Sequence, residues 1–394
     1  MFKKYFPAIV FFIGYIFVSM GMTLLGPIIP HLIFQYNLTY TSTGLIAGIT
    51  YIGGAFSFIG GFIASTIGYF WLTILSLLFM SIGLTIFPLT IPTIFMYLSY
   101  FLLGVGSGFF ETAANPLIAK IYSKRKGMFL NIIHVGWNIG AFIGPLLIGI
   151  SFIENISWRY VYFISSILLL IEILLLLSLK KYIVSDRVEI KPIFRNKKSY
   201  KREVLLFLPI AIGMFLYLGC EQAINVWLPT LIKYRGGSEF LSSISIAVFW
   251  ITIGIGRIVW SPLIDSFGYS RSLKITTLGI LVFSILGTIQ SDPFISLILW
   301  GISGLMFAPM FPTIYALCID VCRKYTGIFS GMLFSIGIIG SFILSSLIGL
   351  MIDIWGIDIA FLSIIFFSAT CFILFISIKP KSSRQSSKPY KVYL

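Results

Sequence analysis

The sequence predicts an all-α membrane protein with about twelve transmembrane helices in two homologous halves. Of its 394 residues, 58% are hydrophobic and only 10% are charged, whereas an average soluble domain is about 25% charged. A transmembrane helix needs roughly 20 consecutive, mostly apolar residues, and such runs follow one another along the chain with short polar breaks. We predict spans at 8–34, 43–67, 72–89, 94–121, 128–151, 158–179, 205–232, 241–264, 273–290, 294–320, 328–351 and 359–378.

The order of these runs divides the chain into four parts. Residues 1–180 and residues 205–378 each contain six predicted spans. Between them, residues 181–204 are rich in lysine and arginine and contain no apolar run long enough to cross a bilayer. We therefore expect a cytoplasmic linker between two six-helix halves. Residues 379–394 are polar, which is typical of a disordered cytoplasmic tail.

An internal repeat supports the two halves. Residues 127–150 align with residues 327–350 without a gap at an offset of 200, and the shared residues are glycines and large apolar residues. In the first segment they are Gly127, Phe129, Ile139, Gly140, Phe142, Ile143, Leu147, Ile148 and Gly149. Glycines in matching register predict two pseudo-symmetric halves that cross the membrane in the same orientation.

The positions of lysine and arginine predict the orientation in the membrane. With twelve spans and a cytoplasmic start, only Arg159, Lys233 and Arg235 fall on the non-cytoplasmic side, and Arg257 falls inside a span. This is the positive-inside pattern, so we predict a multi-pass protein of the plasma or inner membrane with both termini cytoplasmic. The same distribution accounts for the net charge of +15 without a nucleic-acid partner.

Two short loop segments carry a family signature. Residues 61–68 read Gly-Phe-Ile-Ala-Ser-Thr-Ile-Gly, and residues 262–268 read Pro-Leu-Ile-Asp-Ser-Phe-Gly, with Arg271 following. Both resemble the cytoplasmic loop signature Gly-x-Leu-Ala-Asp-Arg-x-Gly of the major facilitator superfamily, although the first segment lacks the Asp and the Arg. This resemblance covers essentially the whole chain. It implies the major facilitator fold and a secondary transporter, not an enzyme, whose halves rock about a central site.

Three further motifs resemble the fucose-galactose-glucose:proton symporter family within that superfamily. They are residues 111–116 (Glu-Thr-Ala-Ala-Asn-Pro), Leu130-Asn131 and residues 311–314 (Phe-Pro-Thr-Ile). The resemblance implies a monomer that couples a proton to uptake of a sugar or similar polyhydroxylated small molecule. Fucose carriers of that family have a carboxylate in the first span, but residues 21–27 contain none, so proton coupling through that position is excluded.

Two other functions stay open. Gly140, Gly144, Pro145 and Gly149 resemble the glycine-proline signature of proton antiporters, so the first alternative is efflux of amphipathic compounds or drugs by proton antiport. The second is a membrane-embedded sensor that binds a solute without carrying it. The sequence contains no nucleotide-binding loop Gly-x-x-x-x-Gly-Lys-Ser/Thr and no cluster of metal ligands, so we predict neither a cofactor nor a metal.

Ionisable side chains inside the predicted spans mark a candidate site, because a charge at mid-membrane costs roughly 2.5 to 3.5 kcal/mol on insertion scales. Glu111 lies in the fourth span, one helical turn before Asn115. An apolar cavity disfavours the ionised form of a carboxylate, which allows it to take up and release a proton. We predict that Glu111 carries the coupling proton or binds substrate hydroxyls. The alternative is a buried carboxylate that a neighbouring helix satisfies.

Polar residues at helical spacing form two stripes, one in the fifth span and one in the seventh. A polar stripe on a membrane helix faces the bundle interior, where amides, an imidazole and a carboxylate suit a hydroxyl-rich ligand. Hydrogen bonding between helices is the alternative. The residues are Asn131, His134 and Asn138 in the fifth span, and Tyr217, Glu221, Gln222 and Asn225 in the seventh.

The remaining charged residues in or near the spans receive other roles. Glu172 lies in the Leu/Ile-rich sixth span, a peripheral scaffold helix in this superfamily, so we predict a structural role for it. Arg257 lies near the cytoplasmic end of the eighth span and is followed by Asp265 and Arg271. We predict that these three form a charged cytoplasmic gate. A snorkelling arginine is the alternative for Arg257.

Overall fold

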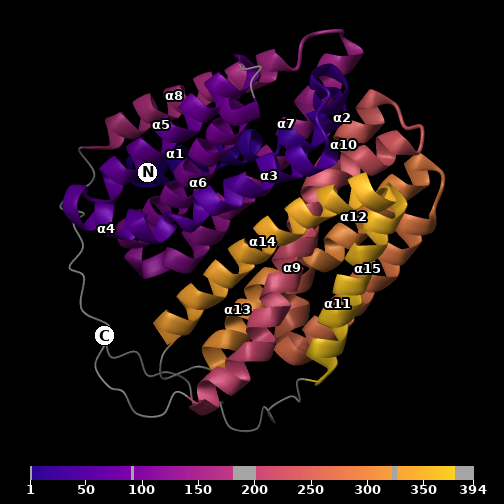
Figure 1. The fold of residues 1–394 in the computed structure, drawn as a ribbon. Coiled ribbons are helices and arrows are strands. Elements are labelled where there is room, and N and C mark those ends of the chain that lie inside the picture. The colour runs from indigo at the N-terminus through magenta and orange to yellow at the C-terminus, as the bar shows by residue number, and fades with distance from the viewer. Residues whose placement is uncertain (1, 90–92, 181–200, 322–325, 378–394) are drawn as a thin grey trace.

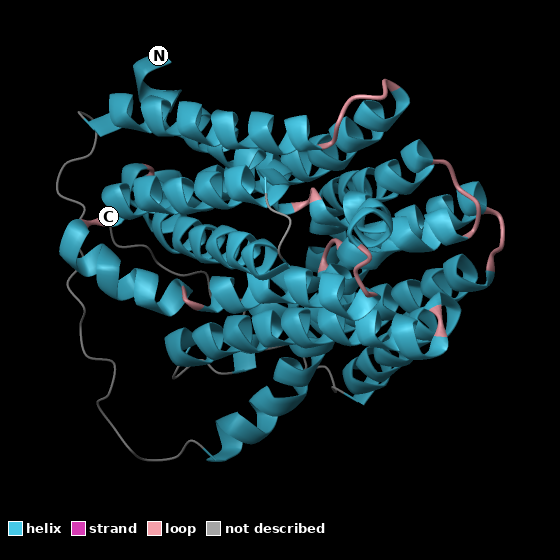
Figure 2. Ribbon diagram, turned by 45° about the horizontal axis from the view of Figure 1, so that its top comes forward, coloured by secondary structure: helices cyan, strands magenta, loops and turns pink. Residues whose placement is uncertain are grey.

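The structure is a computed structural model that describes residues 2–89, 93–180, 201–321 and 326–377. Within these ranges the chain is helical apart from short loops (Figure 2). The α-helices of the first half are α1 (Phe2–Met22), α2 (Leu25–Tyr36), α3 (Tyr40–Ala55), α4 (Ser57–Ile67), α5 (Tyr69–Ile86), α6 (Thr93–Ile121), α7 (Lys126–Ile153) and α8 (Arg159–Leu179). Those of the second half are α9 (Lys201–Tyr234), α10 (Glu239–Phe267), α11 (Tyr269–Ile289), α12 (Pro293–Phe307), α13 (Met310–Val321), α14 (Thr326–Trp355) and α15 (Ile357–Ser377).

The described helices form twelve segments that are long and apolar enough to cross a membrane, which confirms the predicted all-α fold. Three of these segments consist of two helices with a short break, namely α1 with α2, α3 with α4, and α12 with α13. Proline accounts for two of the breaks, because Pro27, Pro309 and Pro312 have no N–H to donate to the preceding helical turn. Residues 181–200 of the predicted linker and the whole predicted tail lie outside the described residues. The last four residues of the predicted linker belong to α9, which begins at Lys201.

The helices form two groups, α1–α8 in indigo to purple and α9–α15 in pink to yellow (Figure 1). Equivalent glycines bring equivalent helices together in the two groups. A Cβ atom on Gly140 of α7 would collide with the carbonyl oxygen of Ile16 in α1, and one on Gly340 of α14 would collide with that of Phe215 in α9. Small residues let helix backbones approach closely. The repeated glycines in the sequence therefore correspond to the same helix contact made twice.

The two halves contact each other at one end of the bundle, through the pairs α3 with α14, α7 with α10, and α2 with α9. At the start of α3, the N–H and hydroxyl of Thr41 donate to Asp353 of α14 at 2.7 and 2.6 Å. At the start of α10, Glu239 lies 2.7 Å from His31 Nε2 of α2 and 2.5 Å from Lys233 Nζ. We call the region defined by these five residues the joined end.

From the joined end, at the upper right of Figure 1, the two groups of ribbons diverge toward the lower left. At the opposite end of the bundle, α1 and α9 begin and α15 ends. Each of these spans runs between that end and the joined end. Contacts between the halves are therefore concentrated away from the ends at which the chain enters and leaves the bundle.

Candidate functional site

A carboxyl cluster in the first half joins α1 to α6. The Tyr15 hydroxyl of α1 donates to Asn115 Oδ1 at 2.9 Å and to Glu111 Oε2 at 3.4 Å. Asn115, one turn after Glu111 on α6, donates through Nδ2 to the same carboxylate oxygen at 2.6 Å. Tyr15 is fully buried, whereas Glu111 and Asn115 are partly exposed. The structure thus brings together the two predicted residues of α6 and adds a tyrosine that the sequence did not single out.

The predicted stripe on α7 divides between two environments. The ring of His134 packs edge-on against Tyr15 with centroids 5.0 Å apart, so His134 joins the first cluster. Asn138 is 4% exposed, lies against Gly254 of α10, and donates to the His134 carbonyl at 3.3 Å. Its Oδ1 is buried without a hydrogen-bond partner among the described residues. The side chain of Asn131 lies outside the described part of the chain.

A second carboxyl cluster lies in the second half and is built mostly within α9. Glu221 accepts a 2.5 Å hydrogen bond from the Tyr217 hydroxyl one turn earlier and a 3.3 Å bond from Gln222 Nε2. Gln222 Oε1 in turn accepts a 2.8 Å bond from the hydroxyl of Tyr51, which comes from α3 in the other half. Glu221 and Tyr217 are 5% and 4% exposed. Tyr217 and Gln222, both predicted with Glu221, therefore contact it, and Tyr51 ties this cluster to the first half.

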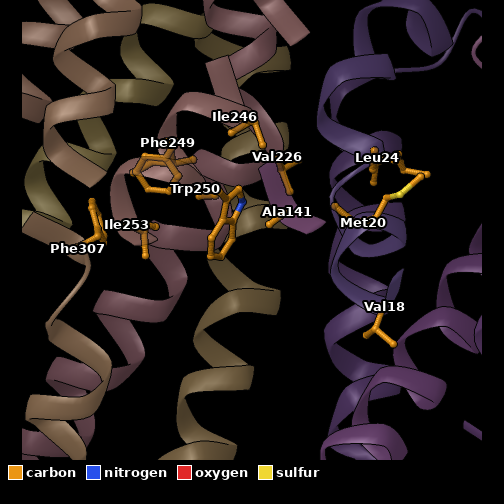
Figure 3. Close-up of a cluster of buried hydrophobic side chains, with 14 of the residues drawn as sticks. Val18, Met20, Leu24, Ala141, Val226, Ile246, Phe249, Trp250, Ile253 and Phe307 are labelled. Carbon is orange, nitrogen blue, oxygen red and sulfur yellow. The ribbon is translucent and has the colours of Figure 1, made fainter. Parts of the chain in front are cut away.

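Asn225 continues the stripe on α9 and binds a tryptophan. Its Oδ1 accepts a 2.8 Å hydrogen bond from Trp250 Nε1 of α10, and both side chains are buried. Figure 3 shows Trp250 among buried hydrophobic side chains that include Phe249, Ile253 and Val226. The indole is thus held in one orientation by a hydrogen bond on one edge and apolar packing around it.

Arg257 connects the two carboxyl clusters electrostatically. This partly buried guanidinium on α10 lies close enough to interact with Glu221 and Tyr217 of the second half and with His134 of the first. Of its predicted gate partners, Arg271 has its Cζ 6.0 Å from the centroid of the Phe267 ring, and the side chain of Asp265 lies outside the described residues. The structure therefore places Arg257 with the candidate site, and the gate stays a prediction.

Glu172 lies apart from both clusters. It is fully buried on α8, and a Cβ atom on Gly14 of α1 would come within 2.8 Å of its Oε1. Neither of its carboxylate oxygens has a hydrogen-bond partner among the described residues. Tyr15, the residue after Gly14, points instead to Glu111, so α1 separates Glu172 from the first cluster. Glu172 therefore lies outside both clusters, and its structural role stays a prediction.

Three residues of the site were missed in the sequence: Tyr15, Tyr51 and Trp250. The chain contains 20 tyrosines and eight tryptophans, and such residues are common at the ends of membrane helices, so residue type alone gave no signal. Only the distance between helices reveals them. No group of three or more potential metal ligands occurs among the residues that the structure describes.

Twelve membrane-crossing helices in two repeated halves, with polar clusters where the halves face each other, define a membrane transport protein. The family model described as Major Facilitator Superfamily matches residues 11–285 and 210–391. The chain belongs to the major facilitator superfamily, and it is accordingly a transport protein and not an enzyme.

Relatives of the whole chain include sugar carriers. The glucose/mannose transporter GlcP of Bacillus subtilis is 27% identical over 87% of this chain and 86% of its own length. A putative glucose/galactose transporter of Helicobacter pylori strain J99 is 25% identical over 86% and 87%. These relatives confirm the resemblance to the fucose-galactose-glucose type. Among solved structures, a mutant of the nucleoside transporter NupG shares the fold with a TM-score of 0.77 at 14% identity, covering 95% of this chain and 98% of its own.

Proposed function

We propose that this protein takes up a sugar or a similar polyhydroxylated solute by proton-coupled alternating access. The observation that carries the proposal is the pair of carboxyl clusters, one in each half, with Arg257 near both and Tyr51 joining the second cluster to the first half. Carboxylates, amides and phenols supply donors and acceptors for hydroxyl groups, and the partly exposed ring of His134 supplies a surface for the apolar face of a sugar. The names of the B. subtilis and H. pylori relatives support the same substrate class.

We assign the coupling proton to Glu111. Glu111 is partly exposed and has two polar partners, the Tyr15 hydroxyl and the Asn115 amide, that can accommodate either form of its carboxyl group. Glu221 is buried and accepts hydrogen bonds from Tyr217 and Gln222, so its carboxyl group is held in one position, where it can bind substrate hydroxyls. Two carboxyl groups in different environments can thus divide proton transfer and substrate binding between them.

The arrangement of the halves supports alternating access. Contacts between the halves are concentrated at the joined end, so the structure corresponds to a state that is closed there. The positive-inside pattern assigns the opposite end to the cytoplasm. We therefore interpret the structure as an inward-facing state of a cell-membrane protein, whose joined end separates during the transport cycle.

The efflux alternative rested on the glycine-proline segment of α7. In the structure, Gly140 and Gly144 pack against the α1 backbone at Ile16 and Met20, so helix packing accounts for these glycines without an antiport function. Uptake is the better-supported direction, and the transport assay below distinguishes the two.

The test is uptake of radiolabelled hexoses, pentoses and fucose into proteoliposomes that contain the purified protein. We expect accumulation of at least one sugar under an inward proton gradient and loss of accumulation when the gradient is collapsed. Accumulation driven only by an inward sodium gradient would replace the proton as the coupling ion. The absence of sugar uptake by correctly oriented, folded protein, together with proton-driven export of amphipathic cations, would overturn the proposal in favour of efflux.

A further inference from the structure

One face of α3 makes a continuous contact with the second half. Gly44, Gly48 and Tyr51 follow one another at helical spacing on this face. A Cβ atom on Gly44 would lie 3.1 Å from the Trp227 ring and 3.2 Å from the Ser345 carbonyl oxygen, and one on Gly48 would meet Phe342 at 2.9 Å. Tyr51 is the next residue of this face in the direction of the opposite end.

The contact ends close to Tyr51. Seven residues further along the chain, the Phe58 side chain is 66% exposed, and among the described residues nothing lies within 4 Å of a Cβ built on Gly61. Both residues belong to α4, which follows α3 after a break at Phe56, so Tyr51 lies near the border between the contact made by α3 and the more exposed surface of α4. At this border its hydroxyl donates across the interface to Gln222 of α9.

This hydrogen bond fixes the orientation of an amide in the second carboxyl cluster. A phenol hydroxyl that donates to Gln222 must bind the carbonyl oxygen of the amide, because the nitrogen carries only donors. The Nε2 group is then directed to Glu221, to which it donates at 3.3 Å. Without Tyr51 the oxygen of Gln222 would lose its donor, and the amide would be held only by its long 3.3 Å bond to Glu221.

We propose that Tyr51 is a positioning residue that orients Gln222 toward Glu221 and holds the joined end closed while the site is empty. A solute hydroxyl that binds Glu221 competes for Gln222, draws the amide away from Tyr51 and removes the bond between the halves. Occupancy of the site thereby favours separation of the joined end. The effect of a bound solute rests on the proposed function. The role of Tyr51 in keeping the joined end closed in the empty protein does not.

The first test measures separation of the joined end without any solute. Ser243 of α10 is fully buried against Gly149 of α7, so a Ser243→Cys reporter, in a chain whose native cysteines are replaced by alanine, should react slowly with a membrane-impermeant thiol reagent. We expect Tyr51→Phe to accelerate the reaction about fivefold, the effect of losing one neutral hydrogen bond. Reaction at the unchanged rate in a folded Tyr51→Phe protein would overturn the proposal.

Tyr97→Phe is the matched control. The hydroxyl of Tyr97 on α6 also donates to α3, at 3.4 Å to the Ser42 carbonyl, but this bond lies within the first half. We expect this variant to leave the labelling rate unchanged. Equal acceleration in Tyr97→Phe and Tyr51→Phe would show a general loosening of α3 and would contradict a specific role for Tyr51.

A double-mutant cycle tests whether Tyr51 acts through Gln222. Gln222→Leu alone should accelerate labelling as much as Tyr51→Phe, and adding Tyr51→Phe to it should have no further effect. If the two substitutions accelerated labelling independently, so that their effects multiplied, Tyr51 would not act through Gln222. Because Gln222→Leu leaves Tyr51 intact, the cycle stays informative even where Tyr51→Phe lowers expression.

The outcomes separate this inference from the proposed function. With Tyr51 intact, a transported sugar should accelerate labelling of the Ser243→Cys reporter, and in Tyr51→Phe, where the bond is already absent, it should accelerate labelling less. If the protein transports no sugar but its labelling still depends on Tyr51, the positioning role is retained and the proposed substrate is wrong. If the protein transports sugar but its labelling does not depend on Tyr51, the proposed substrate is retained and the positioning role is wrong.

Discussion

The two carboxyl clusters differ in how they are assembled. Glu111 is held by Tyr15 from a different helix and is partly exposed, whereas Glu221 is held by Tyr217 of its own helix and is buried. The first cluster therefore depends on the packing of α1 against α6 within one half, whereas the second cluster is built mostly within α9 and contacts the other half through Tyr51. The difference indicates that pseudo-symmetric halves need not divide the chemistry equally, and that the second cluster is the one placed to respond to movement between the halves.

The largest effect is expected for Glu111→Gln. Glutamine can keep hydrogen bonds to Tyr15 and Asn115 but cannot carry a proton, so gradient-driven accumulation should fall to the level seen without a gradient. Exchange of labelled for unlabelled sugar across the membrane should continue. Accumulation equal to that of the wild type would remove Glu111 from coupling.

Glu172→Gln is the matched control for this change. It alters the same functional group in a carboxyl side chain that lies outside both clusters, so accumulation should be unaffected. If Glu172→Gln also abolished gradient-driven uptake, the structural role assigned to Glu172 would be wrong.

Glu221→Gln should weaken binding without uncoupling transport. Glutamine replaces the carboxylate that accepts from Tyr217 and Gln222 by a neutral acceptor. Hydrogen bonds to a charged group are worth about 1.5 to 3 kcal/mol, so we expect KM to rise about tenfold or more. The ratio of inside to outside sugar at saturation should persist, as measured by initial rates and final accumulation. The opposite pattern, with coupling lost and KM retained, would exchange the roles of the two clusters.

Gly14→Ala tests the side of α1 that faces away from the first cluster. The new methyl group would lie 2.8 Å from Glu172 Oε1, and overpacking of this kind costs about 1 to 3 kcal/mol. We expect a lower midpoint of thermal unfolding in detergent, and partial recovery when Glu172→Ala removes the obstructing carboxylate. No described atom lies within 4 Å of a Cβ built on Gly61, so Gly61→Ala should leave the midpoint unchanged. An equal fall in the midpoint in both variants would show that the contact with Glu172 is not the cause.

The smallest effect is expected for Trp250→Phe. The change removes the donor to the buried Asn225 Oδ1, a loss of about 1 kcal/mol, or roughly a fivefold rise in KM. Trp300→Phe removes an indole N–H that is buried without a hydrogen-bond partner among the described residues, so it should leave KM unchanged. A rise in KM in both variants would point to general loss of aromatic packing.

The fold followed from the sequence because burial in a bilayer requires long apolar runs, and those runs are visible without any contact between helices. Glu111 and Glu221 were also visible, because a carboxylate inside an apolar run is rare and costly. The repeat at Gly140 and Gly340 reflected a backbone contact that only glycine permits. Each of these signals is a property of one segment.

The sequence did not reveal the residues whose role depends on a contact with a second segment of the chain. Tyr15 and Tyr51 contact residues 100 and 171 positions away, respectively, and nothing in their own helices distinguishes them from other tyrosines. Arg257 was placed at a gate because of its neighbours in sequence, a prediction that stays untested, and its proximity to Glu221 and His134 depends on how α10 packs against α9 and α7. Side-chain partners across helices require the packing of the whole bundle.

The ionic contacts at the joined end bear on how readily the protein can change shape. His31, Lys233 and Glu239 are each about one-third exposed, with side-chain exposures of 33%, 37% and 36%, and ion pairs this accessible contribute about 1 kcal/mol or less. Salt on that side of the membrane should screen them further. Closure by several weak contacts leaves the two states close in free energy, so the modest binding energy of a small solute is enough to decide which end of the protein is open.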